Sequence, residues 1–114
     1  MAKTMASMRE KKRYIVFKIH SKEIISYPNV KAAIWNSLTE WLGANQLAKA
    51  GVRIIKNLWN EKEQIGFIRT SHKFVDPVKV SLGLIHQIGD QRVIFQTLRV
   101  SGTIKSAKEK IKSS

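Results

Sequence analysis

The side chains that could perform catalysis are few and widely spaced. The chain has 114 residues, with eight carboxylates, three histidines and no cysteine. His20, His72 and His86 do not have the spacing of metal ligands. Glu61 and Glu63 are close together, but they lie in a short polar segment that is typical of an exposed turn. Glycine-rich phosphate loops and the G-x-S-x-G motif are also absent, so we predict no active site and no metal site in the protein itself.

Basic side chains dominate the charge. Lysine and arginine total 21 against eight acidic residues, which gives a net charge of +13 and an isoelectric point near 10.4. Residues 1–13 carry five basic residues and one acidic residue, and residues 102–114 carry four and one. More than half of the excess therefore lies at the two ends, where it could neutralise nucleic-acid phosphates. This distribution favours a nucleic-acid partner over the alternative that the lysines only keep the protein in solution.

The segment Leu98-Arg-Val-Ser-Gly-Thr-Ile-Lys105 has the composition of an anion site. A strand is expected to end at Ser101, and Thr103 is suited to begin a helix. Free N–H groups at a helix N-terminus, two hydroxyls and the cations at 99 and 105 would together suit a phosphate. An ordinary capped turn explains the same residues equally well.

The order of strands and helices predicts an α+β fold. Strands are expected over 14–20, 52–59, 65–71 and 92–101, and helices over 28–42, from Asp76-Pro77 to Gly89, and over 104–112. A further helical turn over 44–50 would end at Gly51. This β-α-β-β-α-β order with a terminal helix is that of a ferredoxin-like (RRM-like) domain with a four-stranded antiparallel sheet. Two helices would cover one face of the sheet and leave the other face free for a partner.

Apolar residues with strand or helix spacing mark the expected core. The first helix would begin near Pro28 and end at Gly43, and Asp76 would cap the second helix. The expected buried residues are Ile15, Phe17 and Ile19 in the first strand, Val30, Ile34, Leu38, Trp41 and Leu42 in the first helix, and Val78, Leu82, Ile85 and Ile88 in the second helix.

The uncovered sheet face could stack bases on aromatic rings, as RNA-recognition modules do. Tyr14 and Phe67 would supply the rings, and Arg69 a nearby cation, if these residues point outward. The segment Gln64-Ile-Gly-Phe-Ile-Arg69 lacks the second aromatic residue of the RNA-recognition signature. A core position for Phe67 is therefore favoured over base stacking.

Three segments of the sequence point to a known family. They are Arg13-Tyr-Ile-Val-Phe17, Ile68-Arg-Thr70 and Ser101-Gly-Thr-Ile-Lys105. In this order they resemble the Pop-five family, the protein subunits of archaeal and eukaryotic ribonuclease P, over roughly residues 13–112. The short form, without a long acidic tail, is similar to the archaeal members.

The resemblance implies a subunit of the cytoplasmic ribonucleoprotein that removes the 5′ leader from precursor tRNA. In that family the RNA is the catalyst and uses magnesium ions, so the protein itself would bind no cofactor. The implied partners are the catalytic domain of ribonuclease P RNA and a barrel-shaped protein subunit, component three, with possible self-association of such pairs. Precursor tRNA would be met only indirectly, and no membrane is involved. The alternative is a stand-alone ferredoxin-like RNA-binding module of ribosomal or chromatin type, which does not explain the Ser101–Lys105 segment.

The chain is expected to form one domain, with a ferredoxin-like body over 14–101, a basic helix of the same domain over 102–114, and a basic N-terminal extension over 1–13. The candidate contact residues come from all three segments. Those expected to meet RNA are Arg9, Lys11, Lys12, Arg13, Arg69, Arg99, Ser101, Gly102, Thr103, Lys105, Lys108 and Lys112. Those expected to face a protein partner are Trp35, Trp59 and Phe74, and for each tryptophan a position at the edge of the core is the alternative.

Overall fold

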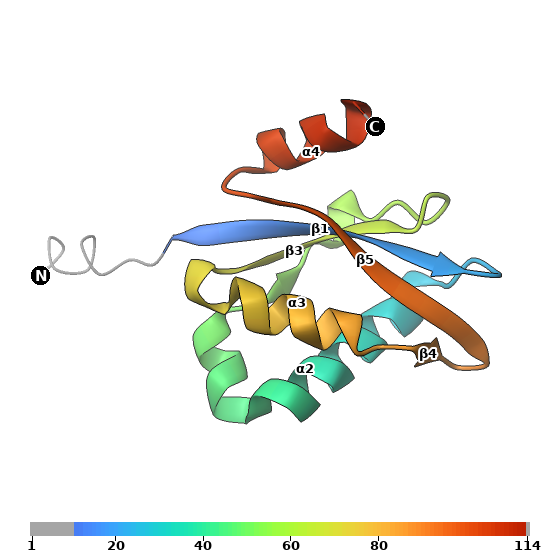
Figure 1. Cartoon of the computed structure of the whole chain (residues 1–114), viewed down its shortest axis with the longest axis horizontal. Helices are drawn as coiled ribbons and strands as arrows, with labels where there is room; N and C mark the ends of the chain where they lie inside the picture. Colours follow the sequence, from blue (N-terminus) through green and yellow to red (C-terminus); the bar gives the residue numbers. More distant parts are fainter. Residues whose placement is uncertain (1–10, 114) are drawn as a thin grey trace, which may run out of the picture.

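Strand β1, Lys12–Ser21, lies inside an antiparallel sheet and packs against helices on both of its sides. The computed structural model describes residues 11–113, with side chains for residues 11–108 (Figure 1). The elements after β1 are α2 Tyr27–Ala50, β2 Arg53–Ile54, a 3₁₀ helix Lys56–Leu58, β3 Ile65–Ser71, a 3₁₀ helix His72–Phe74, α3 Val75–Gly83, β4 Gln87–Ile88, β5 Gln91–Ser101 and α4 Ile104–Ser113. The predicted α+β class is confirmed.

The sheet has five strands in the order β2-β3-β1-β5-β4, and each neighbouring pair is antiparallel. The predicted number was four, and the additional strand is the two-residue β4, which forms a hairpin with β5. Gly89 lies in the hairpin turn with a φ of 59°. Glycine adopts this left-handed conformation without strain, and a helix end needs the same conformation. The sequence pattern around Gly89 was therefore compatible with either structure.

Helices lie on both faces of the sheet. Helices α2 and α3 pack on one face, and α4 lies on the other, against β1 and β5 (Figure 1). The prediction of a free second face is therefore wrong where α4 covers it. Val16, Phe67 and Ala107 form a small second core there, in which Phe67 is only 3% exposed. Phe67 is thus a core residue, as favoured from the sequence, and cannot stack on a base.

The main core lies between the sheet and helices α2 and α3. The predicted alternation of β1 is confirmed, because Ile15, Phe17 and Ile19 all point into this core. The predicted stripe of α2 is confirmed for Val30, Ile34 and Leu38, all of which are fully buried, and Leu42 packs at the edge.

Helix α3 is shorter than predicted, and one expected core residue of α2 is exposed. It begins at Val75, so Asp76 lies in its first turn instead of capping it, and it ends at Gly83 instead of near Gly89. The chain then passes α2 in a non-helical segment and leaves a groove along that helix. Trp41 lines this groove and is 57% exposed, so its predicted burial is wrong. Ile85 and Ile88 are buried as predicted, although they are not helical.

Helix α2 continues beyond its predicted end through a kink at Gly43, where φ is 80° and ψ is 163°. The predicted helical turn over 44–50 is confirmed, and Gly51 ends it in the left-handed conformation. The hydroxyl of Thr70 donates to the carbonyl oxygen of Ala50 at 2.9 Å. This bond ties the end of α2 to β3.

Strand β2 is much shorter than the predicted strand over 52–59. Only Arg53 and Ile54 pair with β3, and the chain then forms a 3₁₀ helix. The predicted turn over 60–64 is confirmed. It ends at Gln64, which has a φ of 57° and whose buried side-chain amide donates to the carbonyl oxygen of Ile25 at 3.0 Å.

Gly66 packs beneath aromatic rings, so an added methyl group there is expected to destabilise the fold. A β-carbon at this position would lie 2.5 Å from Phe17 Cζ and 3.0 Å from Trp59 Cε3. We expect Gly66→Ala to lower the free energy of unfolding by about 1–3 kcal/mol, measured by urea unfolding. Gly83→Ala is the control, because a β-carbon there meets nothing within 4 Å. Equal losses in the two variants would contradict this account.

Candidate nucleic-acid interface

Four side chains form a row across four strands on the face that α4 partly covers. Arg53 of β2 is paired with Arg69 of β3, which is paired with Tyr14 of β1. Tyr14 is paired in turn with Ser101 of β5. Directly paired residues in antiparallel strands project from the same face, and neighbouring strands lie about 4.8 Å apart. We call this set, Arg53, Arg69, Tyr14 and Ser101, the arginine row.

A bulge in the pairing of β1 with β5 brings Arg99 to the same face. Phe95 and Thr97 pair with the core-facing residues Ile19 and Phe17. The register then shifts, and Arg99 pairs with Val16, whose side chain lies under α4. A bulge inserts one residue into a strand and so reverses which side chains face each side of the sheet. Without it, Arg99 would point toward the main core.

Two guanidinium groups in this region have buried donors that the protein does not satisfy. Arg99 Nη2 donates to Ser106 Oγ at 3.0 Å, which links β5 to α4. The Nε atoms of Arg69 and Arg99 are buried and have no hydrogen-bond partner. A buried donor without an acceptor costs about 1–3 kcal/mol. Phosphate oxygens accept strong, charge-assisted hydrogen bonds from arginine. The charges of these half-buried side chains therefore attract a polyanion to this face of the sheet.

Arg53 was missed by reasoning from the sequence. It is exposed and lies directly opposite Arg69, although like charges in this arrangement destabilise a sheet. Arg53 could have been recognised only from the register in which β2 pairs with β3. The sequence does not reveal this register, because apolar and polar residues do not alternate regularly over 52–59. The same applies to Tyr14, which was considered only as a stacking ring.

The Ser101–Lys105 segment forms the turn from β5 into α4. The Ser101 hydroxyl donates to the carbonyl oxygen of Thr103 at 3.1 Å and lies 3.3 Å from Thr103 N. Thr103 Oγ1 accepts from Ser106 N at 3.1 Å, so Thr103 caps α4 as predicted. The buried Ser101 and the capping Thr103 therefore build the turn, whereas Gly102 and Lys105 are exposed.

The start of β1 and the end of β5 lie side by side at one end of the strands. Tyr14 is paired with Ser101, and Arg13 Nη1 lies 3.6 Å from the position that a β-carbon on Gly102 would occupy. Lys12 and Arg13 belong to β1, which begins two residues earlier than predicted. Arg13 therefore lies beside the start of the basic segment 102–114.

The predicted RNA-contacting cations differ in their exposure. Arg9 and the side chain of Lys112 lie outside the described residues. Lys12, Arg13, Arg69 and Arg99 are half-buried, and Lys11, Lys105 and Lys108 are exposed. Their contacts with RNA remain predictions.

The three predicted protein-facing residues, Trp35, Trp59 and Phe74, are half-buried and pack against the edge of the main core. Trp59 lies with its ring centroid 6.4 Å from that of Phe17 and 6.0 Å from that of Tyr27. Burial raises the pKa of Tyr27, because desolvation disfavours the tyrosinate. These contacts fit the core-edge alternative for the tryptophans, and a role in protein binding remains a prediction.

Within residues 11–108, no group of three histidine and acidic side chains is arranged to hold a metal ion. The helices of the described chain include none that is long and apolar enough to cross a membrane. What the geometry does provide is a basic surface on the sheet face that carries α4.

Comparison with known proteins supports the resemblance drawn from the sequence. The model of the Rpp14/Pop5 family matches residues 13–112. The chain belongs to this family. It is 40% identical to ribonuclease P protein component 2 of Pyrococcus furiosus, over 94% of this chain and 88% of that protein. It is 38% identical to ribonuclease P protein component 2 of Thermococcus gammatolerans, over 91% and 85% of the two chains.

The fold of this Rpp14/Pop5 family member is also similar to that of a chain in the cryo-EM structure of yeast ribonuclease MRP. The TM-score is 0.62, with coverage of 93% of this chain and 95% of the other. The sequence identity is 15%, so this similarity concerns the fold.

The repulsion between Arg53 and Arg69 predicts that the unbound protein gains stability when one charge is removed. We expect Arg53→Gln to raise the free energy of unfolding by about 0.2–1 kcal/mol in dilute buffer. The gain should shrink in about 1 M salt, because the Debye length falls to about 3 Å. Urea unfolding at two salt concentrations measures both effects. Lys56→Gln, at an exposed position outside the row, should change little, and a loss of stability in Arg53→Gln would contradict the prediction.

Proposed function

We propose that this chain is a protein subunit of ribonuclease P, the ribonucleoprotein that removes the 5′ leader from precursor tRNA. Its relatives are ribonuclease P protein components, which supports this function. The main structural support for an RNA partner is the arginine row, together with Arg99 on the same face of the sheet. A net charge of +13 extends the attraction for a polyanion beyond these contacts.

In this proposal the protein binds the catalytic domain of the RNA and stabilises its folded form. Arg53, Arg69 and Arg99 contact phosphates, and the counterions that these phosphates release favour binding. Magnesium ions otherwise screen the repulsion between RNA strands that pack closely. The protein therefore lowers the magnesium concentration that the RNA needs. The RNA holds the catalytic magnesium and meets the precursor tRNA, so no protein side chain contacts the scissile bond.

The strand order supports a ferredoxin-like assignment of the fold. Without β4, the order β2-β3-β1-β5 places the first strand between the third and the last, with α2 and α3 on one face. This arrangement fits the split βαβ motif. We further propose that the chain works in the cytoplasm and pairs with the barrel-shaped subunit, component three, and that such pairs associate with each other.

Reconstitution tests the function directly. Ribonuclease P RNA is mixed with component three and the full chain, and the cleavage rate of precursor tRNA is measured against magnesium concentration. We expect the half-maximal rate to occur at a lower magnesium concentration than with the RNA alone. If the two proteins leave the dependence of the cleavage rate on magnesium concentration unchanged, the proposed function is contradicted.

The salt dependence of RNA binding tests the basic surface. Arg53→Gln and Lys105→Gln remove exposed cations, so both variants should keep the wild-type fold. Each should reduce the slope of log K against log salt concentration by about 0.7–0.9, the value for one phosphate contact. Lys22→Gln and Lys62→Gln are matched controls from a separate shallow depression that β1 forms with the 60–64 turn, and their slopes should equal that of the wild type. Equal reductions in both pairs would show that only the total charge matters.

A further inference from the structure

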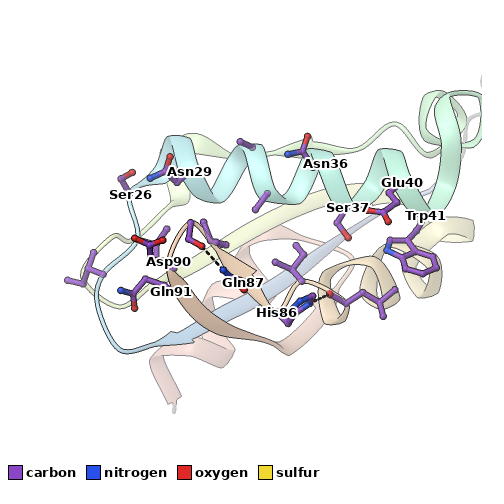
Figure 2. A pocket seen from close by; sticks show the side chains of 18 residues that line it. Ser26, Asn29, Asn36, Ser37, Glu40, Trp41, His86, Gln87, Asp90 and Gln91 are labelled. Atoms are coloured by element: carbon purple, nitrogen blue, oxygen red, sulfur yellow. Dashed lines mark hydrogen bonds between the residues drawn. The ribbon is translucent and has the colours of Figure 1, made fainter.

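A groove runs along the flank of α2, opposite the segment that follows α3. It has a volume of about 830 Å³ and is lined by eighteen residues, mainly from the first half of α2 and from residues 84–91 (Figure 2). Trp41 and Leu84 line it and are 57% and 42% exposed. Large apolar side chains exposed in a concave surface mark a binding site.

The charge of this groove is opposite to that of the molecule. None of the eighteen lining residues is lysine or arginine, although these make up 21 of the 114 residues of the chain. Its charged acidic side chains are Glu40 and Asp90, both exposed. Phosphates would be repelled here, whereas an apolar protein segment that carries cations would be attracted. The composition, with an exposed tryptophan and no lysine, is also that of a protein interface.

The two carboxylates lie at opposite ends of the groove. Figure 2 shows Glu40 beside Trp41 at one end, and Asp90 near Asn29 and Ser26 at the other. From Asn29 to Glu40 the helix rises by roughly 17 Å, at about 1.5 Å per residue. An occupant that reaches both carboxylates therefore needs about five extended residues or about three helical turns. This length fits a polypeptide segment and exceeds that of a single phosphate group.

We propose that the groove binds a segment of a second protein subunit, apolar in its middle and with lysine or arginine at each end. The identity of that subunit as component three rests on the proposed function. The groove lies on the side of α2 and α3, whereas the arginine row projects from the sheet face that carries α4. Protein and RNA therefore occupy different faces of the chain and bind at the same time.

Calorimetric titration of the full chain with component three tests the charges. Glu40→Lys combined with Asp90→Lys should weaken binding at least tenfold, because two attractions become repulsions. Glu61→Lys combined with Glu63→Lys is the matched control, since it makes the same change in net charge at exposed residues outside the groove. The control should bind within twofold of the wild type.

A second pair of variants tests the apolar contacts. Trp41→Ala should weaken binding to component three at least tenfold. Ile94→Ala, at a position on β5 that is 67% exposed and lies outside the groove, should leave it unchanged. Both side chains are exposed in the free protein, so neither variant should alter the fold.

Three outcomes would overturn the proposal. If the groove variants and their controls bind component three equally well, the pairing stands and the groove is not its site. If the wild-type chain does not bind component three, both the groove assignment and the pairing fall, while RNA binding is judged separately from the salt slopes. If sedimentation shows that the chain alone forms a dimer that Glu40→Lys with Asp90→Lys abolishes, the occupant is a second copy of this chain.

Discussion

The burial of β1 on both faces is the constraint on which the rest of the structure depends. Ile15 and Phe17 pack toward α2 and α3, and Val16 between them packs under α4. A strand that is buried on both sides cannot accommodate unpaired charge in its middle, because desolvating an ion is too costly. The cations of β1 itself lie on either side of this doubly buried stretch, because Lys12 and Arg13 precede it and Lys18 follows it, with its Nζ donating to the carbonyl oxygen of Glu63. At the start of β1, the ends of β3 and β5 lie alongside, and this places Arg69 and Arg99 close to the same strand.

The β-bulge allows one strand to serve both the core and the basic surface. Val93 and Phe95 at the start of β5 fill the main core, and a regular strand would point Arg99 into that same core. The register shift after Thr97 turns Arg99 to the face that carries α4. There its guanidinium bonds to α4 through Ser106 while its Nε stays without a partner. Because of the bulge, the first half of β5 contributes side chains to the main core, and Arg99 in its second half points to the opposite face of the sheet.

Local patterns predicted the parts of the fold that depend on local interactions. Strand β3 has the predicted bounds Ile65–Ser71, and Thr103 caps α4 through a contact within one turn. The errors arose where contacts between segments that are distant in the sequence determine the structure. Trp41 has the spacing of a buried residue but is 57% exposed, and α3, which packs against α2, ends at Gly83. The position of Arg53 opposite Arg69 and the bulge at Leu98 depend on strand register, which a single sequence does not contain.

The small core beneath α4 also limits how this protein can recognise RNA. Phe67 is buried against Val16 and Ala107, so the sheet does not present that ring to a base. The same sheet face carries Arg53, Arg69 and Arg99, and arginine side chains bind phosphates regardless of base sequence. Recognition by phosphate position requires an RNA that already has a defined shape. This requirement fits the proposed role in ribonuclease P, in which the positive charge would hold an RNA by its phosphates.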